Sequence, residues 1–419
     1  MGGLLVVMGS GETAPTMVKP HRSIFERVGD RPAVLLDTPY GFQSNADDIS
    51  TRAVGYFAAS VGRTVDVVPW RAAPPPGLAR ERAIAMLGAA GWIFAGPGSP
   101  TYALKHWRGT PVEAALVGVL NRDGVVVLAS AAALTLGSHT VPVYEIYKAG
   151  FDPRWEPGLD LVRQVTGLTA VVIPHYDNAE GGNHDTRYCY LGEDRLSMME
   201  AELPEETFVL GVDEHTAVLL DLGERVATVV GNGRLTIRRA GHAITYPAGT
   251  VLSFDDIRAA AATGARPAGS DAAAPARESA PGGSDASAAR TSLRGATEEI
   301  VAHFDEALGR RDVDACVEAV LELEQTLLDW SADTLTSDEG DFARGQLRGM
   351  VVRLGELANR GARDPRDVVG PLVESLLELR GRARATRDFA TSDWVRDRLA
   401  AAAVEVRDTP DGAEWHLRS

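Results

Sequence analysis

Ser130 stands in the setting of a serine nucleophile. It follows the apolar run Val125–Ala129 and precedes the three alanines Ala131–Ala133. An apolar, mostly β-branched run predicts a buried parallel strand, and the small residues after it allow a tight turn into a helix. Such a turn lifts the serine out of the carboxyl edge of the sheet and leaves a helix N-terminus free to face developing negative charge. We therefore expect Ser130 to act as a nucleophile.

A serine nucleophile needs a base, a carboxylate that orients the base, and donors for the oxyanion. His175 is the candidate base, because it comes just past the apolar run Ala170–Ile173 and so should lie at the edge of the sheet that carries Ser130. A histidine that only caps a loop is the alternative. The candidate oxyanion donors are the backbone amides of Gly98 and Ala131. The carboxylates that could orient the base are Glu214, which also follows an apolar run, and Asp177, Glu180 and Glu193.

The segment after His175 is rich in polar residues and is expected to recognise the substrate, with Arg187 pairing with a carboxylate. A loop held by its own hydrogen bonds is an equally good interpretation. The residues assigned to substrate binding are Asp177, Asn178, Glu180, His184 and Arg187. A divalent metal held by His175, His184 and nearby carboxylates is a further alternative, but the spacing fits no common metal motif. We expect neither a metal nor another cofactor.

Alternating apolar runs and helical patterns precede and follow Ser130. The expected strands are Leu4–Met8, Ala33–Leu36, Val65–Val68, Trp92–Ala95 and Val125–Ala129. This alternation predicts an α/β fold with a doubly wound, mainly parallel sheet. Short runs between residues 208 and 239 predict a hairpin-rich edge, which closes a first domain over residues 1–258.

Residues 259–295 are mostly Ala, Gly, Ser, Pro and Asp, and we expect a flexible linker because such a stretch buries too little apolar surface to offset chain entropy. An ordered loop is the alternative. Residues 296–419 carry helical spacing almost throughout and predict a helical C-terminal domain. The turn at Asp408–Gly412, flanked by Val404–Val406 and Glu414–Leu417, could form a terminal β-hairpin.

Bulk composition points to an ordinary globular protein. The chain has 419 residues, a hydrophobic content of 45% and a formal net charge of -16, which disfavours nonspecific attraction to nucleic acid or an anionic membrane. Its two cysteines, Cys189 and Cys316, lie far apart, so a reducing, cytoplasmic setting is expected. No basic flank marks a signal peptide, and no run reaches the roughly 20 apolar residues that span a bilayer.

The first 250 residues resemble the cyanophycinase and aspartyl dipeptidase (dipeptidase E) family of serine peptidases, which share a fold with class I glutamine amidotransferases. The motifs that carry the resemblance are MGSGET, IFAGPGSPTYAL, LASAAAL, the histidine after VVIP, and GVDEHTA. The resemblance implies that Ser130 is the nucleophile, that His175 and Glu214 complete the triad, and that Gly96–Gly98 form an oxyanion loop. Ala132 replaces the glycine of the family's elbow, which would strain a turn that needs positive φ.

The C-terminal helices resemble the C-terminal region of cysteinyl-tRNA synthetases, most specifically in RDFATSDWVRDRLAAAAVEVRDTPDGAEW. Neither a HIGH-like nor a KMSKS-like motif occurs, so this region cannot activate an amino acid. It could bind tRNA or serve as a protein-interaction or dimerisation unit. The arginines that could contact RNA are Arg380, Arg382, Arg384, Arg387, Arg396 and Arg398, although aspartates are interleaved with them.

The leading hypothesis is hydrolysis of a small peptide or amide by a Ser130–His175–Glu214 triad. Because the base must be neutral, activity should fall below about pH 6 to 6.5. A catalytically silent protein that binds a metabolite or tRNA with the same cleft is the alternative, and the missing elbow glycine motivates it. Transfer of the acyl group to an amine is a third reading. A homodimer is compatible with all three.

Overall fold

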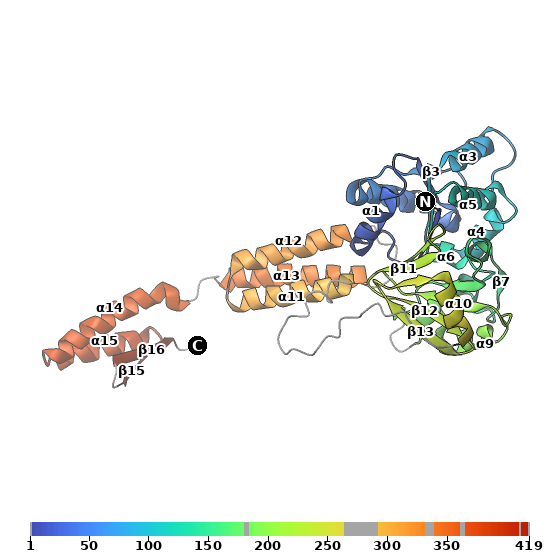
Figure 1. Cartoon of the computed structure of the whole chain (residues 1–419). Coiled ribbons are helices and arrows are strands. Elements are labelled where there is room, and N and C mark those ends of the chain that lie inside the picture. The colour runs from blue at the N-terminus through green and yellow to red at the C-terminus, as the bar shows by residue number, and fades with distance from the viewer. Residues whose placement is uncertain are drawn as a thin grey trace. The chain divides into compact units, whose positions relative to one another are not determined.

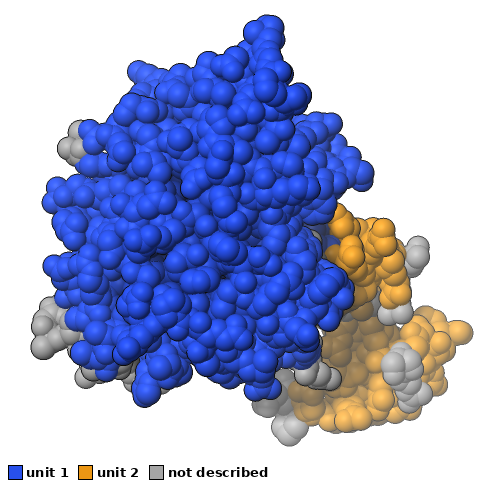
Figure 2. All heavy atoms as spheres, turned by 90° about the vertical axis from the view of Figure 1, so that its right-hand side faces the viewer, with its two compact units in different colours: residues 1–295, 326–340 blue, residues 296–325, 341–419 orange. Residues whose placement is uncertain are grey.

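The chain folds into two compact units. The structure, a computed structural model, describes residues 2–179, 184–263, 292–331, 339–360, 365–409 and 412–417 (Figure 1). One unit comprises residues 1–295 and 326–340, and the other comprises residues 296–325 and 341–419 (Figure 2). We call them the α/β unit and the helical unit.

The main sheet of the α/β unit has eight strands among the described residues. Five neighbouring strands, which include the strand that ends at Ala129, run parallel to one another. Three antiparallel strands extend the sheet on one side of them. The predicted doubly wound, mainly parallel sheet is confirmed for this part. In spatial order the strands are β14 (Val251–Ser253), β11 (Val226–Gly231), β10 (Thr216–Asp221), β1 (Leu4–Met8), β5 (Val125–Ala129), β4 (Trp92–Ala95), β2 (Ala33–Leu36) and β3 (Asp66–Val68).

Helices cover both faces of this sheet because alternate strand residues point to opposite sides. On β1, Leu5 and Val7 belong to one buried cluster, and Leu4 and Val6 belong to the other. Each fully buried aliphatic side chain of this kind contributes about 1.5–3 kcal/mol. The helices packed on the Leu5 face are α3 (Leu78–Ala89), α4 (Pro100–Trp107) and α5 (Pro111–Asn121), and those on the Leu4 face are α1 (Val18–Glu26) and α2 (Ala46–Tyr56).

A second, four-stranded sheet carries the strands that follow Ser130 in sequence. Its spatial order is β13 (His242–Pro247), β12 (Arg234–Arg239), β9 (Phe208–Val212) and β8 (Ala170–Ile173). Only the β8–β9 pair is parallel within this sheet. His175 therefore comes from a different sheet than Ser130, and the expectation that one sheet edge carries both residues is wrong. The antiparallel pairings suit the hairpin-rich sequence between residues 208 and 239.

Short elements connect the sheets and shape the site. They are η1 (Pro15–Met17), η2 (Thr38–Tyr40), the π-helices η3 (Phe57–Val61) and η4 (Tyr144–Lys148), α6 (Ala131–Leu134), β6 (His139–Thr140), β7 (Glu156–Pro157), α7 (Leu161–Thr166), α8 (Arg187–Tyr190) and α9 (Gly192–Glu200). The predicted linker, residues 259–295, lies for the most part outside the described residues. Both of its ends are helical, since α10 (Phe254–Thr263) continues five residues past the expected domain end and α11 begins at Leu293.

The helical unit is built from α11 (Leu293–Gly309), α12 (Val313–Asp329), α13 (Glu339–Arg360), α14 (Pro365–Ala385) and α15 (Phe389–Ala401), parts of which are counted with the α/β unit. The terminal hairpin is confirmed: β15 (Val404–Thr409) pairs antiparallel with β16 (Gly412–Leu417). Val373, Val395 and Leu399 form a buried cluster with Val404 of the hairpin. None of the described helices is long and apolar enough to cross a membrane.

Candidate active site

Ser130 occupies a sharp turn between β5 and α6. Its backbone has φ 50° and ψ −122°, a conformation that a residue with a side chain seldom adopts and that the surrounding structure must hold in place. Two backbone hydrogen bonds do so: the Ser130 amide donates to the carbonyl of Met8 on β1, and the Ala132 amide donates to that of Gly96. The turn matches the strand-to-helix elbow that exposes nucleophiles at the edge of a sheet.

The alanine that replaces the elbow glycine carries no strain. Among the described residues with positive φ, Ser130 is present and Ala132 is not. Ala132 is fully buried and lies inside α6. The turn does not require positive φ at this position, so the condition under which alanine would strain it is not met, and the unusual conformation falls on the serine itself.

His175 reaches Ser130 from the loop that follows β8. Its Nε2 lies 2.9 Å from the Ser130 Oγ, and its ring is almost completely buried. The backbone of His175 also has a positive φ, of 48°, and its carbonyl accepts hydrogen bonds from the amides of Asn178 and Cys189. These bonds fix the turn, so that the ring points back toward the main sheet.

Glu214 meets the other side of the same imidazole. Its Oε1 lies 2.7 Å from His175 Nδ1 and accepts a second hydrogen bond from the side-chain amide of Asn178 at 3.1 Å. Burial alone would raise the pKa of Glu214, but hydrogen bonds and charge attraction from His175, with the bond from Asn178, outweigh it and hold the pKa below its usual value. Glu214 is thus favoured as a carboxylate.

Two further carboxyl groups, those of Asp177 and Asp213, lie close to Glu214. Asp177 accepts a hydrogen bond from the Glu214 amide at 2.8 Å, and burial raises its pKa. Asp213 has its pKa raised to about 7, mainly by burial and then by the negative charge of Asp177. Since like charges in one place disfavour ionisation, these two groups take up protons more readily than Glu214 does.

Of the residues predicted to bind substrate, those that the structure describes lie beside Glu214 or at the surface. Asn178 is buried behind Glu214, and Asp177 supports the Glu214 backbone. Arg187 forms a two-pronged ion pair with Asp185, two residues earlier in the chain, and His184 is exposed. Glu180 lies outside the described residues. None of the described members of this set lines the pocket at Ser130, and their role in substrate binding stays a prediction.

The candidate oxyanion donors flank the serine. Gly98 has φ 131°, and a Cβ there would lie 2.1 Å from the carbonyl oxygen of Pro39, so the loop requires glycine. Within the described residues, neither the Gly98 nor the Ala131 amide donates a hydrogen bond to another backbone group. Both residues line the pocket that contains Ser130. Two such free amides can stabilise an oxyanion.

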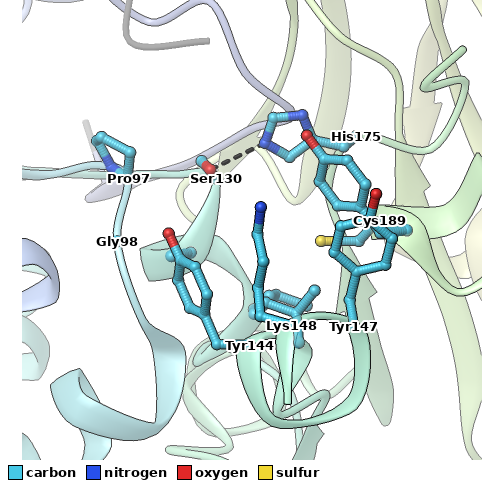
Figure 3. Close-up of a pocket in the computed structure, with 12 residues that line it drawn as sticks. Pro97, Gly98, Ser130, Tyr144, Tyr147, Lys148, His175 and Cys189 are labelled. Atoms are coloured by element: carbon cyan, nitrogen blue, oxygen red, sulfur yellow. Dashed lines mark hydrogen bonds between the residues drawn. The ribbon is translucent and has the colours of Figure 1, made fainter. Parts of the chain in front are cut away.

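Aromatic rings and one cation complete the pocket (Figure 3). Tyr144, Tyr147 and Lys148 come from η4, and Lys148 points from it toward the hydroxyl of Ser130. The sequence alone makes Tyr144 and Tyr147 candidates for lining the cleft, with solvated surface and partial core as the favoured alternative, and it does not point to Lys148, Cys189 or Tyr190. No simple sequence signal marks Lys148, because η4 is a π-helix. Burial raises the pKa of Cys189 to about 12, which keeps it a thiol.

A metal has no evident place in the described part of the chain. No group of three or more His, Cys, Asp or Glu side chains there is arranged to hold an ion. His175 and Asp177, two members of the metal set considered from the sequence, instead contact Ser130 and Glu214 or the Glu214 backbone.

The residue after Glu214 is also buried within the α/β unit. His215, with φ 50°, places its Nδ1 3.0 Å from the hydroxyl of Thr16, and its ring contacts that of Trp330 edge to face at 5.5 Å. Trp330 belongs to the segment 326–340 that this unit includes. Residues beyond position 296 thus complete the environment of the Glu214 loop, which the expected boundary between the domains had not anticipated.

Comparison with known proteins gives relatives for each end of the chain. No family model matches it. A solved structure of a peptidase from an acI-B1 Actinobacterium matches 60% of this chain and 97% of its own, at 19% identity and a TM-score of 0.48. The cysteine–tRNA ligase of Arthrobacter sp. is 42% identical over 90 residues, which are 20% of this chain and 18% of the ligase.

The cysteine–tRNA ligase of Micrococcus luteus is 32% identical over 162 residues, 36% of this chain and 30% of the ligase. The chain thus spans less than a third of the length of either ligase. The predicted resemblance of the C-terminal region to cysteinyl-tRNA synthetases is confirmed by these relatives.

Proposed function

We propose that the protein is a serine hydrolase that cleaves a small peptide or amide through Ser130, His175 and Glu214. One observation carries the proposal. The Ser130 Oγ lies 2.9 Å from His175 Nε2, and His175 Nδ1 lies 2.7 Å from Glu214 Oε1, so hydrogen bonds connect the three side chains, and Ser130 and His175 line a pocket. The strained backbone of Ser130 supports it, since a serine that only packed would have no need of such a conformation.

The geometry defines a role for each group. A carboxylate at Glu214 accepts a hydrogen bond from the Nδ1–H of His175, so that Nε2 keeps its lone pair and can take the proton of Ser130. The Ser130 oxygen then attacks the carbonyl carbon, and the amides of Gly98 and Ala131 hold the resulting oxyanion. His175 returns the proton to the leaving amine, and water releases the acyl group by the same route.

The test is labelling of the purified full-length protein with a fluorophosphonate, from which an activated serine displaces fluoride. Wild type should be labelled, whereas Ser130→Ala and His175→Ala should not. Ser138→Ala is the matched control, because Ser138 also lies 3.1 Å from a histidine, His139, for which the described residues show no carboxylate partner. A folded wild type that resists labelling, or labelling that survives Ser130→Ala, would reject the proposal.

The helical unit is better suited to a protein partner than to tRNA. Four of the arginines that could contact RNA already pair with carboxylates: Arg380 and Arg384 with Asp408, Arg382 with Glu378, and Arg396 with Asp393 and Asp397. Phe389 and Trp394 of α15 are more than half exposed, as protein interfaces often require. We expect no shift of tRNA in a gel-retardation assay with the full chain, and a salt-sensitive shift would favour RNA instead.

A further inference from the structure

A second concavity adjoins the pocket at Ser130. We call it the aromatic groove; its walls are Phe42, Tyr102 and Tyr144, and its remaining lining residues are Ser99, Thr101, Lys105 and Glu145. The Phe42 ring lies 5.2 Å from that of Tyr102 at an angle of 53°, and 6.5 Å from that of Tyr144 at 82°. Tilted and edge-on rings at these distances leave ring faces and edges available to a further aromatic group.

The aromatic groove is continuous with the candidate active site. Tyr144 lines both concavities, so one ring separates the space beside Ser130 from the space beside Phe42. The loop that carries the candidate oxyanion donor Gly98 leads directly into Ser99 and Thr101 of the groove. A group bonded to a carbonyl at Ser130 could therefore extend along this loop without leaving the surface of the protein.

Internal bonds fix the groove relative to the nucleophile. The Ser99 amide donates to the carbonyl of Pro39 at 2.7 Å, which ties the oxyanion loop to the turn that carries Phe42. The hydroxyl of Thr101, in the first turn of α4 just after this loop, donates to Glu145 at 2.6 Å, which ties the start of α4 to the helix that carries Tyr144. The segments that carry Phe42 and Tyr144 are thus both tied to the chain at or just after Gly98, and such attachment pre-organises a binding site.

Phe42 is unusual for its neighbourhood. It is 50% exposed, whereas Tyr40, two residues earlier, is 2% exposed. A single exposed aromatic ring needs no explanation by itself. Here the ring packs against the rings of Tyr102 and Tyr144 and lines a hollow next to the pocket of Ser130, so an apolar group bound in the hollow would remove the exposed part of Phe42 from water.

We propose that the aromatic groove binds an aromatic group of the substrate whose scissile carbonyl lies at Ser130. This inference rests on the proposed hydrolase function and narrows it to a peptide or amide that carries an aromatic ring. The groove supplies affinity and selectivity for that ring, and the triad supplies the chemistry.

The test compares two fluorophosphonates that share one short alkyl chain and end in either a phenyl or a methyl group. Second-order labelling rates are measured on the full-length protein for wild type, Phe42→Ala and Leu78→Ala. Leu78 is the matched control, because it is an exposed apolar residue of the same unit that lines neither concavity. Melting curves establish that each variant is folded.

Wild type and Leu78→Ala should react about tenfold faster with the phenyl probe than with the methyl probe, and Phe42→Ala should bring the ratio close to one. If wild type reacts with both probes at the same rate, the proposed role of the groove is rejected and the proposed hydrolase function still stands. A ratio that survives Phe42→Ala, even with both rates lowered, would also overturn it. If neither probe labels folded wild type, both the proposed hydrolase function and the proposed role of the groove are rejected.

Discussion

The two units use unusual backbone conformations for different purposes. In the helical unit, positive φ occurs at Arg387 and Ala403, just past the ends of α14 and α15, where left-handed residues commonly terminate helices. In the α/β unit, Asp123 just past α5 and Ala240 between β12 and β13 have positive φ for equally local reasons, but Ser130, His175 and His215 have positive φ in or next to the candidate active site. A conformation that ends a helix has an ordinary local cause, whereas three at one site indicate that tertiary structure holds strained residues for chemistry.

The two units also differ in how far their ionisable side chains are buried. The α/β unit buries His175 against Glu214, and it buries His21 completely. The helical unit pairs its arginines with carboxylates that are mostly exposed, as in Arg382 with Glu378. Buried ionisable groups respond strongly to substitution and pH, while exposed pairs respond weakly. Substitutions should therefore have large effects in one unit and small effects in the other.

The largest effect is expected from Glu214→Gln. The amide keeps the shape of the side chain but removes the charge that favours the His175 tautomer with a free Nε2, so fluorophosphonate labelling should slow by about 10²–10⁴-fold. Melting curves check that the variant folds. Glu193→Gln, at another carboxylate considered from the sequence, is the control and should label as wild type does, since Glu193 pairs with Arg238 instead. Equal labelling rates in Glu214→Gln and wild type would contradict the triad.

A pH effect on stability should come from His21. Burial lowers its pKa to about 4, although the hydrogen bond to the Glu12 carbonyl opposes this. The unfolded chain takes up a proton near pH 6.5 while the folded chain does so only near 4, so the histidine makes stability fall as the pH drops through this window. The slope is about 1.4 kcal/mol per pH unit, or about 3 kcal/mol in all.

The measurement is urea unfolding of the α/β unit within the full chain between pH 7 and pH 4. His21→Gln keeps a donor for Glu12 but does not titrate, so the difference in unfolding free energy between wild type and variant should change with pH. His242→Gln, at an exposed histidine, should show no such change. A difference that is constant with pH would contradict this, because it would mean that His21 has the same pKa in the folded and the unfolded chain.

Much of this arrangement could be predicted from the sequence. The strand Val125–Ala129 and the serine after it were predictable because an apolar, β-branched run followed by alanines has few other structures. The candidates His175 and Glu214 could be predicted because each follows an apolar run. Their distances from Ser130 could not be predicted, because β8 and β9 belong to a separate sheet. Sequence periodicity does not encode which strands pair across such distances.

The pocket lining was harder to predict for a similar reason. Lys148 lies on a π-helix, whose five-residue bonding pattern has no simple sequence signature, and Cys189 has a positive φ, of 55°, which a cysteine seldom adopts. Asn178 is predicted to bind substrate because it is polar and close to His175, and nothing in the sequence indicates that its side-chain amide donates a hydrogen bond to Glu214. Polar residues at a site serve the catalytic groups as often as they serve the ligand.

Ala132→Gly separates backbone strain from packing in the α/β unit. Because Ala132 is buried in α6 and does not require positive φ, glycine should relieve nothing and should remove a buried methyl group. The unfolding free energy should fall by about 1–2 kcal/mol. Labelling of Ser130 should not accelerate. Faster labelling would mean that the elbow is strained at Ala132 after all, and Ala133→Gly is the neighbouring control for a simple loss of a methyl group.

The smallest effect is expected from Asp408→Asn in the helical unit. Arg380 reaches Asp408 through two hydrogen bonds, of 2.6 and 2.9 Å, and Arg384 adds a third at 2.8 Å. Arg380 is nearly buried but Asp408 is half exposed, so solvent screens the pair and the loss should stay near about 1 kcal/mol. Calorimetry should detect it as a lower melting temperature of the helical unit with unchanged labelling at Ser130. Asp393→Asn, whose partner lies at 3.8 Å, should cost less still. A loss at Asp408 of several kcal/mol would contradict the contrast between the units, because it would make this surface network as sensitive as the buried groups around His175.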